Sequence, residues 1–167
     1  MLLSSPYSGL EIYRMDKIIY AKFLSSHRVI STCRANGGIR EDLLYLANHQ
    51  SCEPRSHEGK IHKMIKLSPT DYLKLVCEKY DLPYEKTALL STAADMYLAR
   101  FSKMSYRNLT VFSIVTAGVE GNAGRAGDKA HYFEERNGYE KVDAGTVNIM
   151  IFINQELTLG ALTRAIV

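Results

Sequence analysis

A glycine-rich stretch that directly follows a short apolar run constrains the fold of this chain most. The stretch reads TAGVEGNAGRAGD over residues 116–128 and places a glycine at every third position from Gly118 to Gly127. The preceding run, LTVFSIV over residues 109–115, is typical of a buried strand because it is short, β-branched and aromatic. Glycines after a strand allow a ligand to approach bare backbone N–H groups. The pattern fits a ligand-binding loop, and a long polar hairpin loop is the alternative.

Composition indicates a single globular domain over residues 1–167, with 46% hydrophobic and 23% charged residues. The net charge of +3 is spread along the chain rather than clustered, so we expect no nucleic-acid partner. Three widely spaced cysteines favour reduced thiols over a disulfide framework. No signal peptide and no membrane-spanning run are recognisable, so we expect a soluble cytoplasmic protein with no membrane partner.

The first half of the sequence predicts strands followed by helices. Leu10–Arg14, Ile18–Phe23 and Arg28–Thr32 are separated by short breaks, which predicts an antiparallel meander. Apolar residues at helical spacing predict a short helix over Ile39–Asn48, after a tight turn at Asn36 and two glycines. The stretch Ser68-Pro69-Thr70-Asp71 predicts the capped start of a second helix that runs to Tyr80.

The second half predicts two more strands and a final helix. A short buried strand over Thr87–Thr92 leads to Asp95, and residues 96–105 are ambiguous between helix and strand. Residues 129–143 read as a surface hairpin or lid with a turn at Asn137-Gly138. The run GTVNIMIFIN over residues 145–154 predicts a central strand covered on both faces, in which the amide of Asn148 must find partners. A helix begins near Thr158 and is still running at Val167.

These elements predict an α+β domain with six to eight strands in a mostly antiparallel or mixed sheet and two or three helices packed on it. Several polar residues are open to two interpretations. His49 is either a general base or a surface histidine at a helix end, and Cys33 is either a nucleophile or a small residue at a strand end. The histidines at positions 57 and 62 lack a recognised zinc spacing, so we expect no metal site.

Five motifs in matching order resemble the adenosylcobinamide amidohydrolase family. In chain order they are ANGGIREDLLYLANHQ, TAADM over residues 92–96, YRNLTVFSIV with the glycine stretch that follows it, GTVNIMIFIN and LTLGALTRAIV. The resemblance implies hydrolysis of the amide that joins the aminopropanol arm of adenosylcobinamide to the corrin ring. The products would be adenosylcobyric acid and 1-aminopropan-2-ol, in corrinoid salvage for vitamin B12 (cobalamin) biosynthesis. The resemblance implies no resident cofactor, because the cobalt arrives with the small-molecule substrate.

Amide hydrolysis needs a base, oxyanion donors and an acid for the leaving amine. We predict that Asp95 or Asp128 activates water and that His49 protonates the leaving amine. Backbone N–H groups around the glycines suit the oxyanion. The residues predicted to bind the substrate, mainly through its amide side chains, are Asn36, Gly121, Asn122, Gly124, Arg125 and Asn148. Loop or sheet structure is the alternative for each.

Two departures from the family pattern stand out. Leu159 occupies a position that is usually proline in the family, which affects only the helix start. The family also continues beyond the final helix, so we expect this chain to lack the family's C-terminal part and to self-associate through exposed apolar surface. A corrinoid-binding module that does not cleave its ligand is therefore the alternative function.

Overall fold

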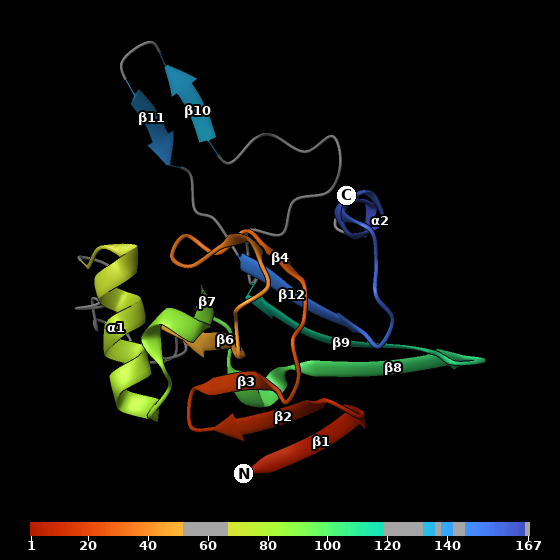
Figure 1. Ribbon diagram of the computed structural model, residues 1–167. Coiled ribbons are helices and arrows are strands. Elements are labelled where there is room, and N and C mark those ends of the chain that lie inside the picture. Colours follow the sequence, from red (N-terminus) through yellow and green to blue (C-terminus); the bar gives the residue numbers. More distant parts are fainter. Residues whose placement is uncertain (52–66, 119–131, 136–137, 142–145, 166–167) are drawn as a thin grey trace.

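The computed structural model describes residues 1–51, 67–118, 132–135, 138–141 and 146–165 (Figure 1). These residues form twelve strands in four sheets and two α-helices. The α+β prediction is therefore confirmed in outline. The strands outnumber the six to eight predicted because residues 2–7, which the sequence left unassigned, form a strand, and because strands replace the helix predicted over Ile39–Asn48.

A five-stranded sheet forms the centre of the molecule, with strand order β1-β2-β3-β6-β7. Its strands are β1 (Leu2–Tyr7), β2 (Leu10–Met15), β3 (Ile18–Phe23), β6 (Tyr45–Gln50) and β7 (Thr87–Thr92). Neighbours pair antiparallel except β6 and β7, which are parallel. The carboxyl ends of β6 and β7 therefore lie at the same edge of the sheet.

The segment predicted as a helix over Ile39–Asn48 is instead two strands, and this prediction was wrong. The short strand β5 (Gly38–Arg40) pairs with β4 (Val29–Ser31), and β6 follows after the buried Leu43. Strand β6 is hydrogen-bonded on both sides, by β3 and by β7, and these ladders override the helical spacing of its apolar residues. The predicted three-stranded meander also fails at β4, which pairs with β5 rather than with β3.

The helix predicted after Ser68 is confirmed as α1 (Pro69–Tyr80). The Ser68 hydroxyl accepts a hydrogen bond from the Asp71 N–H at 3.1 Å, and Pro69 is the first helical residue. The buried face of α1 includes Leu73 and Cys77, so Cys77 is a core residue. The final helix is α2 (Leu159–Arg164), capped by the Thr158 hydroxyl. Two 3₁₀ turns flank β7, at Tyr84–Lys86 (η2) and Met96–Leu98 (η3).

A second, three-stranded sheet has the order β12-β9-β8. Its strands are β8 (Arg100–Tyr106), β9 (Leu109–Gly118) and β12 (Thr146–Ile153). The predicted hairpin near Asn137-Gly138 is also present, as β10 (Tyr132–Glu135) paired with β11 (Gly138–Lys141). Segment 96–105, ambiguous in the sequence, begins as η3 and continues as β8.

Strand β12 lies at the edge of this sheet, so the predicted central strand with two covered faces is wrong. Met150 and Phe152 point inward and are 6% and 3% exposed, whereas Ile149 and Ile151 point outward and are 56% and 43% exposed. An apolar run of this kind has the composition of a fully buried strand, and the pattern alone does not show that one face lies open. The inward residues supply the core between the two sheets.

Two apolar clusters hold the layers together. One lies between the five-stranded and three-stranded sheets and includes Ile12, Ile19, Ile114 and Met150. The other lies between the opposite face of the five-stranded sheet and α1. None of the described helices is long and apolar enough to cross a membrane.

We expect Gly37→Ala to destabilise the fold by about 1–3 kcal/mol, because the new methyl group would collide with backbone that must then shift. A Cβ at Gly37 would lie 2.0 Å from the Cys33 carbonyl oxygen. Gly160→Ala is the matched control, because no atom lies within 4 Å of its Cβ position and alanine favours the helix. Thermal melting compares the variants, and an unchanged melting temperature for Gly37→Ala would contradict this account of the turn.

Candidate functional site

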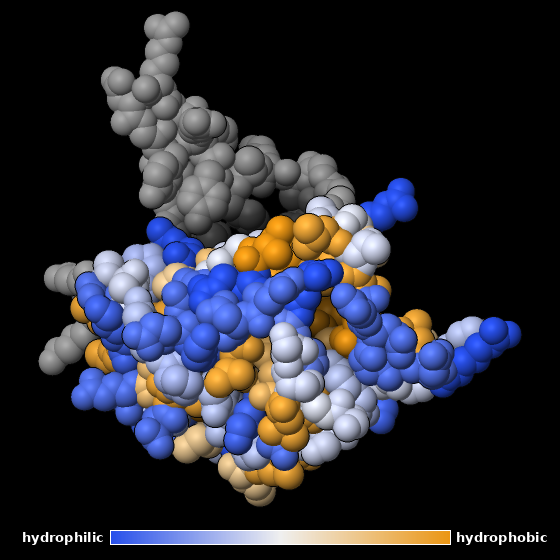
Figure 2. Space-filling model, in the orientation of Figure 1, coloured by the Kyte–Doolittle hydropathy of each residue, from blue (hydrophilic) through white to orange (hydrophobic). Residues whose placement is uncertain are grey.

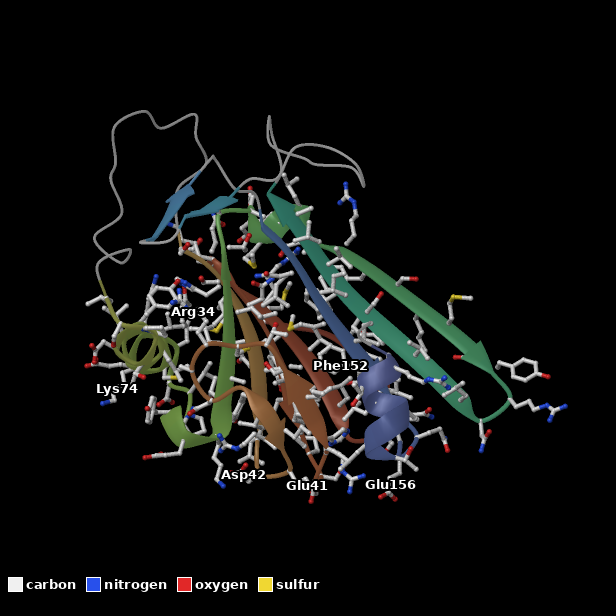
Figure 3. All side chains as sticks on the ribbon, turned by 90° about the horizontal axis from the view of Figure 1, so that it is seen from above. Arg34, Glu41, Asp42, Lys74, Phe152 and Glu156 are labelled. Carbon is white, nitrogen blue, oxygen red and sulfur yellow. The ribbon has the colours of Figure 1, made fainter. Side chains whose placement is uncertain are left out.

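The candidate site is a cavity between two strand edges that diverge. β7 is the last strand of the five-stranded sheet, and β12 is the edge strand of the other. The two strands meet where the Asn148 side-chain N–H donates to the Ser91 carbonyl oxygen at 3.1 Å. Figure 3 shows the green β7 and the blue β12 close together at one end and separating toward the other. The cavity occupies this opening and measures about 1010 Å³.

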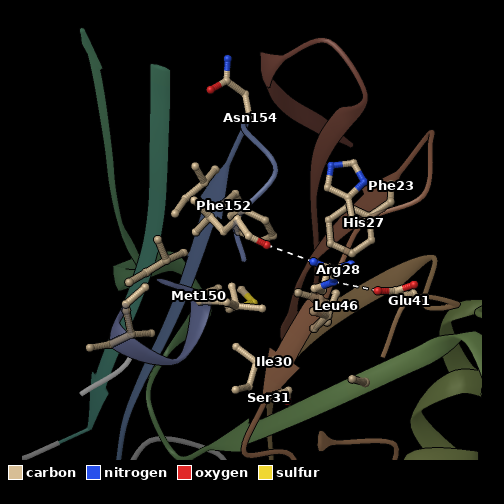
Figure 4. Close-up of a pocket in the computed structure, with 18 of the residues that line it drawn as sticks. Phe23, His27, Arg28, Ile30, Ser31, Glu41, Leu46, Met150, Phe152 and Asn154 are labelled. Carbon is tan, nitrogen blue, oxygen red and sulfur yellow. Dashed lines mark hydrogen bonds and ion pairs between the residues drawn. The ribbon is translucent and has the colours of Figure 1, made fainter. Parts of the chain in front are cut away.

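The walls of the cavity are mainly apolar. Phe23, Leu46 and Leu90 line it from the five-stranded sheet, and Met150 and Phe152 line it from β12 (Figure 4). Hydrophobic surface is visible between hydrophilic residues on this face of the molecule (Figure 2). The volume lies at the upper end of the range of about 300–1,000 Å³ that is usual for small-molecule sites. The cavity therefore suits a large, partly apolar ligand.

The free edge of β12 adds backbone polar groups to this apolar wall. In an antiparallel strand, every second residue directs its backbone N–H and C=O groups toward the paired strand. The residues between them direct these groups toward the opposite side. The Asn154 N–H donates to Thr110 of β9, whereas the Ile153 carbonyl accepts from the Tyr7 hydroxyl on the opposite side. By this alternation, Ile149 and Ile151, which both line the cavity, present their backbone groups at the free edge. These groups can pair with amides of a ligand.

A buried amide network stands where the two sheets meet. The Asn148 side-chain N–H groups donate to Asn48 Oδ1 at 2.9 Å and to the Ser91 carbonyl oxygen. The Asn48 amide donates in turn to Thr116 Oγ1 at 2.8 Å. Asn48, Thr116 and Asn148 are 1%, 2% and 8% exposed, so these bonds satisfy groups that water barely reaches. The prediction that Asn148 is buried and needs partners is confirmed.

The Asn148 amide has an acceptor position that no described residue fills, and Asn148 lines the cavity. Because the Ser91 carbonyl can only accept, Asn148 must present its NH₂ group there, which fixes the orientation of the amide. Its Oδ1 accepts no hydrogen bond from any residue that the structure describes, although Asn148 lines the cavity. This oxygen can accept an N–H or O–H group of a ligand.

Arg28 joins the two sides of the cavity. Its Nε atom donates to Glu41 Oε1 at 2.7 Å, and its Nη1 atom donates to the Leu157 carbonyl at 3.0 Å (Figure 4). The hydrogen bond to Glu41 raises the pKa of Arg28 above its ordinary value. A guanidinium group has five N–H donors, so the Nη2 donors remain after these two bonds. Of the described residues that line the cavity, Arg28 is the one lysine or arginine.

His27 lies beside Arg28 on the cavity wall. Its ring stacks on Phe23 with centroids 4.3 Å apart, and Nδ1 lies 2.8 Å from the Ser25 carbonyl oxygen. A carbonyl oxygen cannot donate, so Nδ1 carries the proton and Nε2 of the neutral ring has a lone pair. His27 and Arg28 could not be predicted from the sequence, because the local pattern SSHR shows no motif. Only the fold brings them opposite β12.

Of the predicted catalytic residues, His49 lies inside the core and away from the cavity lining. It belongs to β6 rather than to a helix end, and its side chain is 1% exposed. Its Nδ1 atom lies 2.6 Å from the Tyr72 hydroxyl, and the rings of Tyr72 and Tyr80 meet its ring edge-on. The environment is that of a hydrogen-bonded core histidine, and the catalytic role of His49 stays a prediction.

Asp95 and Asn36 also lie outside the cavity lining. Asp95 caps η3, with its carboxylate accepting from the Tyr97 N–H at 2.8 Å. Asn36 has a φ of 55° and donates to the carbonyl oxygens of Tyr84 and Thr87, so its amide secures a turn. These bonds support the structural alternative for Asn36. Asp95 is half-buried, and its Oδ2 accepts no hydrogen bond from the residues that the structure describes.

The remaining predicted site residues fall on segment 119–131, outside the described residues. They are Gly121, Asn122, Gly124, Arg125 and Asp128. The structure does show where this segment starts: a Cβ on Gly118 would lie 3.2 Å from the backbone nitrogen of Ala94. The ends of β7 and β9 therefore meet closely, and this contact places the start of the glycine stretch beside the segment that leads to Asp95.

Burial raises the pKa of two further groups that line the cavity, Cys33 and Tyr7. Cys33 lines the cavity, and burial raises the pKa of its thiol, which argues against the nucleophile interpretation. Burial also raises the pKa of Tyr7 to about 12, so its hydroxyl stays protonated. Among the described residues, no group of three or more His, Cys, Asp or Glu side chains could hold a metal ion.

We expect Asn48→Ala to lower the free energy of unfolding by about 1–3 kcal/mol, because it leaves buried groups of Asn148 and Thr116 without partners. Asn108→Ala at an exposed turn is the matched control and should change stability little. Chemical denaturation measures both. Equal stability of the two variants would show that the network does not hold the sheets together.

The chain is similar to known proteins over most of its length. An alignment with a protein of Methanocaldococcus jannaschii, named Uncharacterized protein MJ1613, gives 34% identity over 161 residues. It covers 90% of this chain and 59% of that protein, so the chain spans less than two thirds of the relative's length. No solved structure matches. A family model described as adenosylcobinamide amidohydrolase matches residues 3–167, and the chain therefore belongs to that family.

Proposed function

We propose that this protein hydrolyses the amide between the aminopropanol arm and the corrin ring of adenosylcobinamide. The products are adenosylcobyric acid and 1-aminopropan-2-ol, which returns a salvaged corrinoid to cobalamin synthesis. The observation that carries this proposal is the family match over residues 3–167. The cobalt enters with the substrate. Amide hydrolysis then requires protein groups that activate water and stabilise the developing charge.

The cavity supports the proposal because its chemistry matches a corrinoid. Such a ligand has a broad apolar ring with amide side chains around it. Apolar residues such as Phe152 and Leu90 suit the ring, and the free edge of β12 and Asn148 Oδ1 suit amides, which both donate and accept. Of the residues predicted to bind substrate, Asn148 is the one that lines this cavity in the described part of the chain.

We expect purified protein to release 1-aminopropan-2-ol from adenosylcobinamide, detected by derivatisation of the free amine. The corrinoid product gains a carboxylate at the cleaved position, so its anion-exchange retention should shift in parallel. Adenosylcobyric acid, which lacks the scissile amide, is the control substrate. Tight binding of adenosylcobinamide without release of amine would instead support a corrinoid-binding module.

A second prediction ties the ligand to the cavity. Ile30 of β4 lines it, whereas Ile39, the residue paired with Ile30 on β5, is 54% exposed and does not. We expect Ile30→Trp to fill the cavity and to weaken corrinoid affinity roughly tenfold or more, a loss of about 1.4 kcal/mol. Ile39→Trp is the matched control and should leave the dissociation constant unchanged. Calorimetric titration measures both, and equal affinities would place the ligand elsewhere.

A further inference from the structure

We propose that His27 is the general base that activates water for amide cleavage, and that Arg28 binds the negative charge that develops on the carbonyl oxygen. This inference rests on the proposed amidohydrolase function and assigns its chemistry to the cavity. It differs from the sequence prediction, which gave the base to Asp95 or Asp128.

The geometry of His27 is that of an oriented base. The Ser25 carbonyl holds the Nδ1 proton at 2.8 Å, and the stack on Phe23 fixes the plane of the ring. Nε2 therefore has the lone pair, and no residue that the structure describes donates to it. An acceptor on Nδ1–H also stabilises the cationic ring that forms after proton uptake. His49, in contrast, is 1% exposed and does not line the cavity.

The geometry of Arg28 is that of a fixed anion donor. Glu41 and the Leu157 carbonyl occupy Nε and one Nη1 position, which holds the guanidinium plane while the Nη2 donors stay available. The other charged side chains that line the cavity are Glu41 and Glu156. Both are acidic, so Arg28 is the group there that can stabilise an oxyanion or the product carboxylate.

The proposed steps balance with water as the co-reactant. Nε2 of His27 takes a proton from water as its oxygen adds to the amide carbon, and the carbonyl π electrons move to the oxygen held by Arg28. The tetrahedral intermediate collapses, the C–N bond breaks, and the proton on Nε2 passes to the leaving nitrogen. The acid loses its proton at neutral pH and remains paired with Arg28, while the amine leaves as its ammonium form.

The first test separates catalysis from structure at His27. In His27→Asn, the side-chain amide can still donate to the Ser25 carbonyl but has no base. We expect kcat/KM for amine release to fall by about 100- to 10,000-fold, with the dissociation constant for adenosylcobinamide nearly unchanged. Added imidazole should restore turnover to His27→Ala, a rescue that a purely structural role would not permit.

The second test uses two matched ion pairs. Arg28 and Arg40 each bind a carboxylate through Nε, at 2.7 and 2.6 Å, and are 31% and 28% exposed, but only Arg28 lines the cavity. Arg28→Lys should lower kcat about tenfold or more, because lysine lacks the planar set of guanidinium N–H donors. Arg40→Lys should leave kcat unchanged.

The outcomes distinguish this inference from the proposed function. Amine release by the wild type together with wild-type kcat/KM in His27→Asn would overturn the role of His27 and leave the function standing. Equal kcat in both lysine variants would overturn the role of Arg28. A wild-type protein that releases no amine would overturn the function and the inference together.

Discussion

The contact between Asn148 and Ser91 is the interaction on which the architecture of the site depends. It joins the edges of two sheets at one end, and the bonds from Asn148 to Asn48 and from Asn48 to Thr116 satisfy the buried amides behind it. Because the strands diverge from this point, one polar contact determines both where the sheets touch and where the cavity opens. Packing between the sheets then builds the apolar wall on which a ligand would lie.

The fold was predictable where local chemistry decides the structure. The Ser68–Pro69 cap correctly predicted the start of α1. The turn signal at Asn137-Gly138 correctly predicted the hairpin of β10 and β11. Prediction failed for β6 and β12, whose environments depend on distant strands. The apolar residues of β6 have helical spacing, but parallel pairing with β7 makes this segment a strand. Strand β12 is a continuous apolar run, but its edge position leaves one face exposed.

The site was predictable only in part, for the same reason. Asn148 stood out because a polar residue in an apolar run must have partners. His27 and Arg28 gave no signal, because their relation to β12 spans more than a hundred residues of sequence and arises from sheet packing alone. His49 looked like a site residue because histidines often are, yet the tyrosines of α1 enclose it.

The edge of β12 that no described strand pairs with bears on whether another chain can add a strand there. A free strand edge is a template on which another chain can add a strand, and proteins usually shield such edges. Here residues 28–33 and the end of the chain around Leu162 flank the edge across the cavity. A whole incoming strand would have to displace Arg28 from the Leu157 carbonyl, whereas a single amide would not. The same backbone that could recognise a small ligand is thus screened from strand addition.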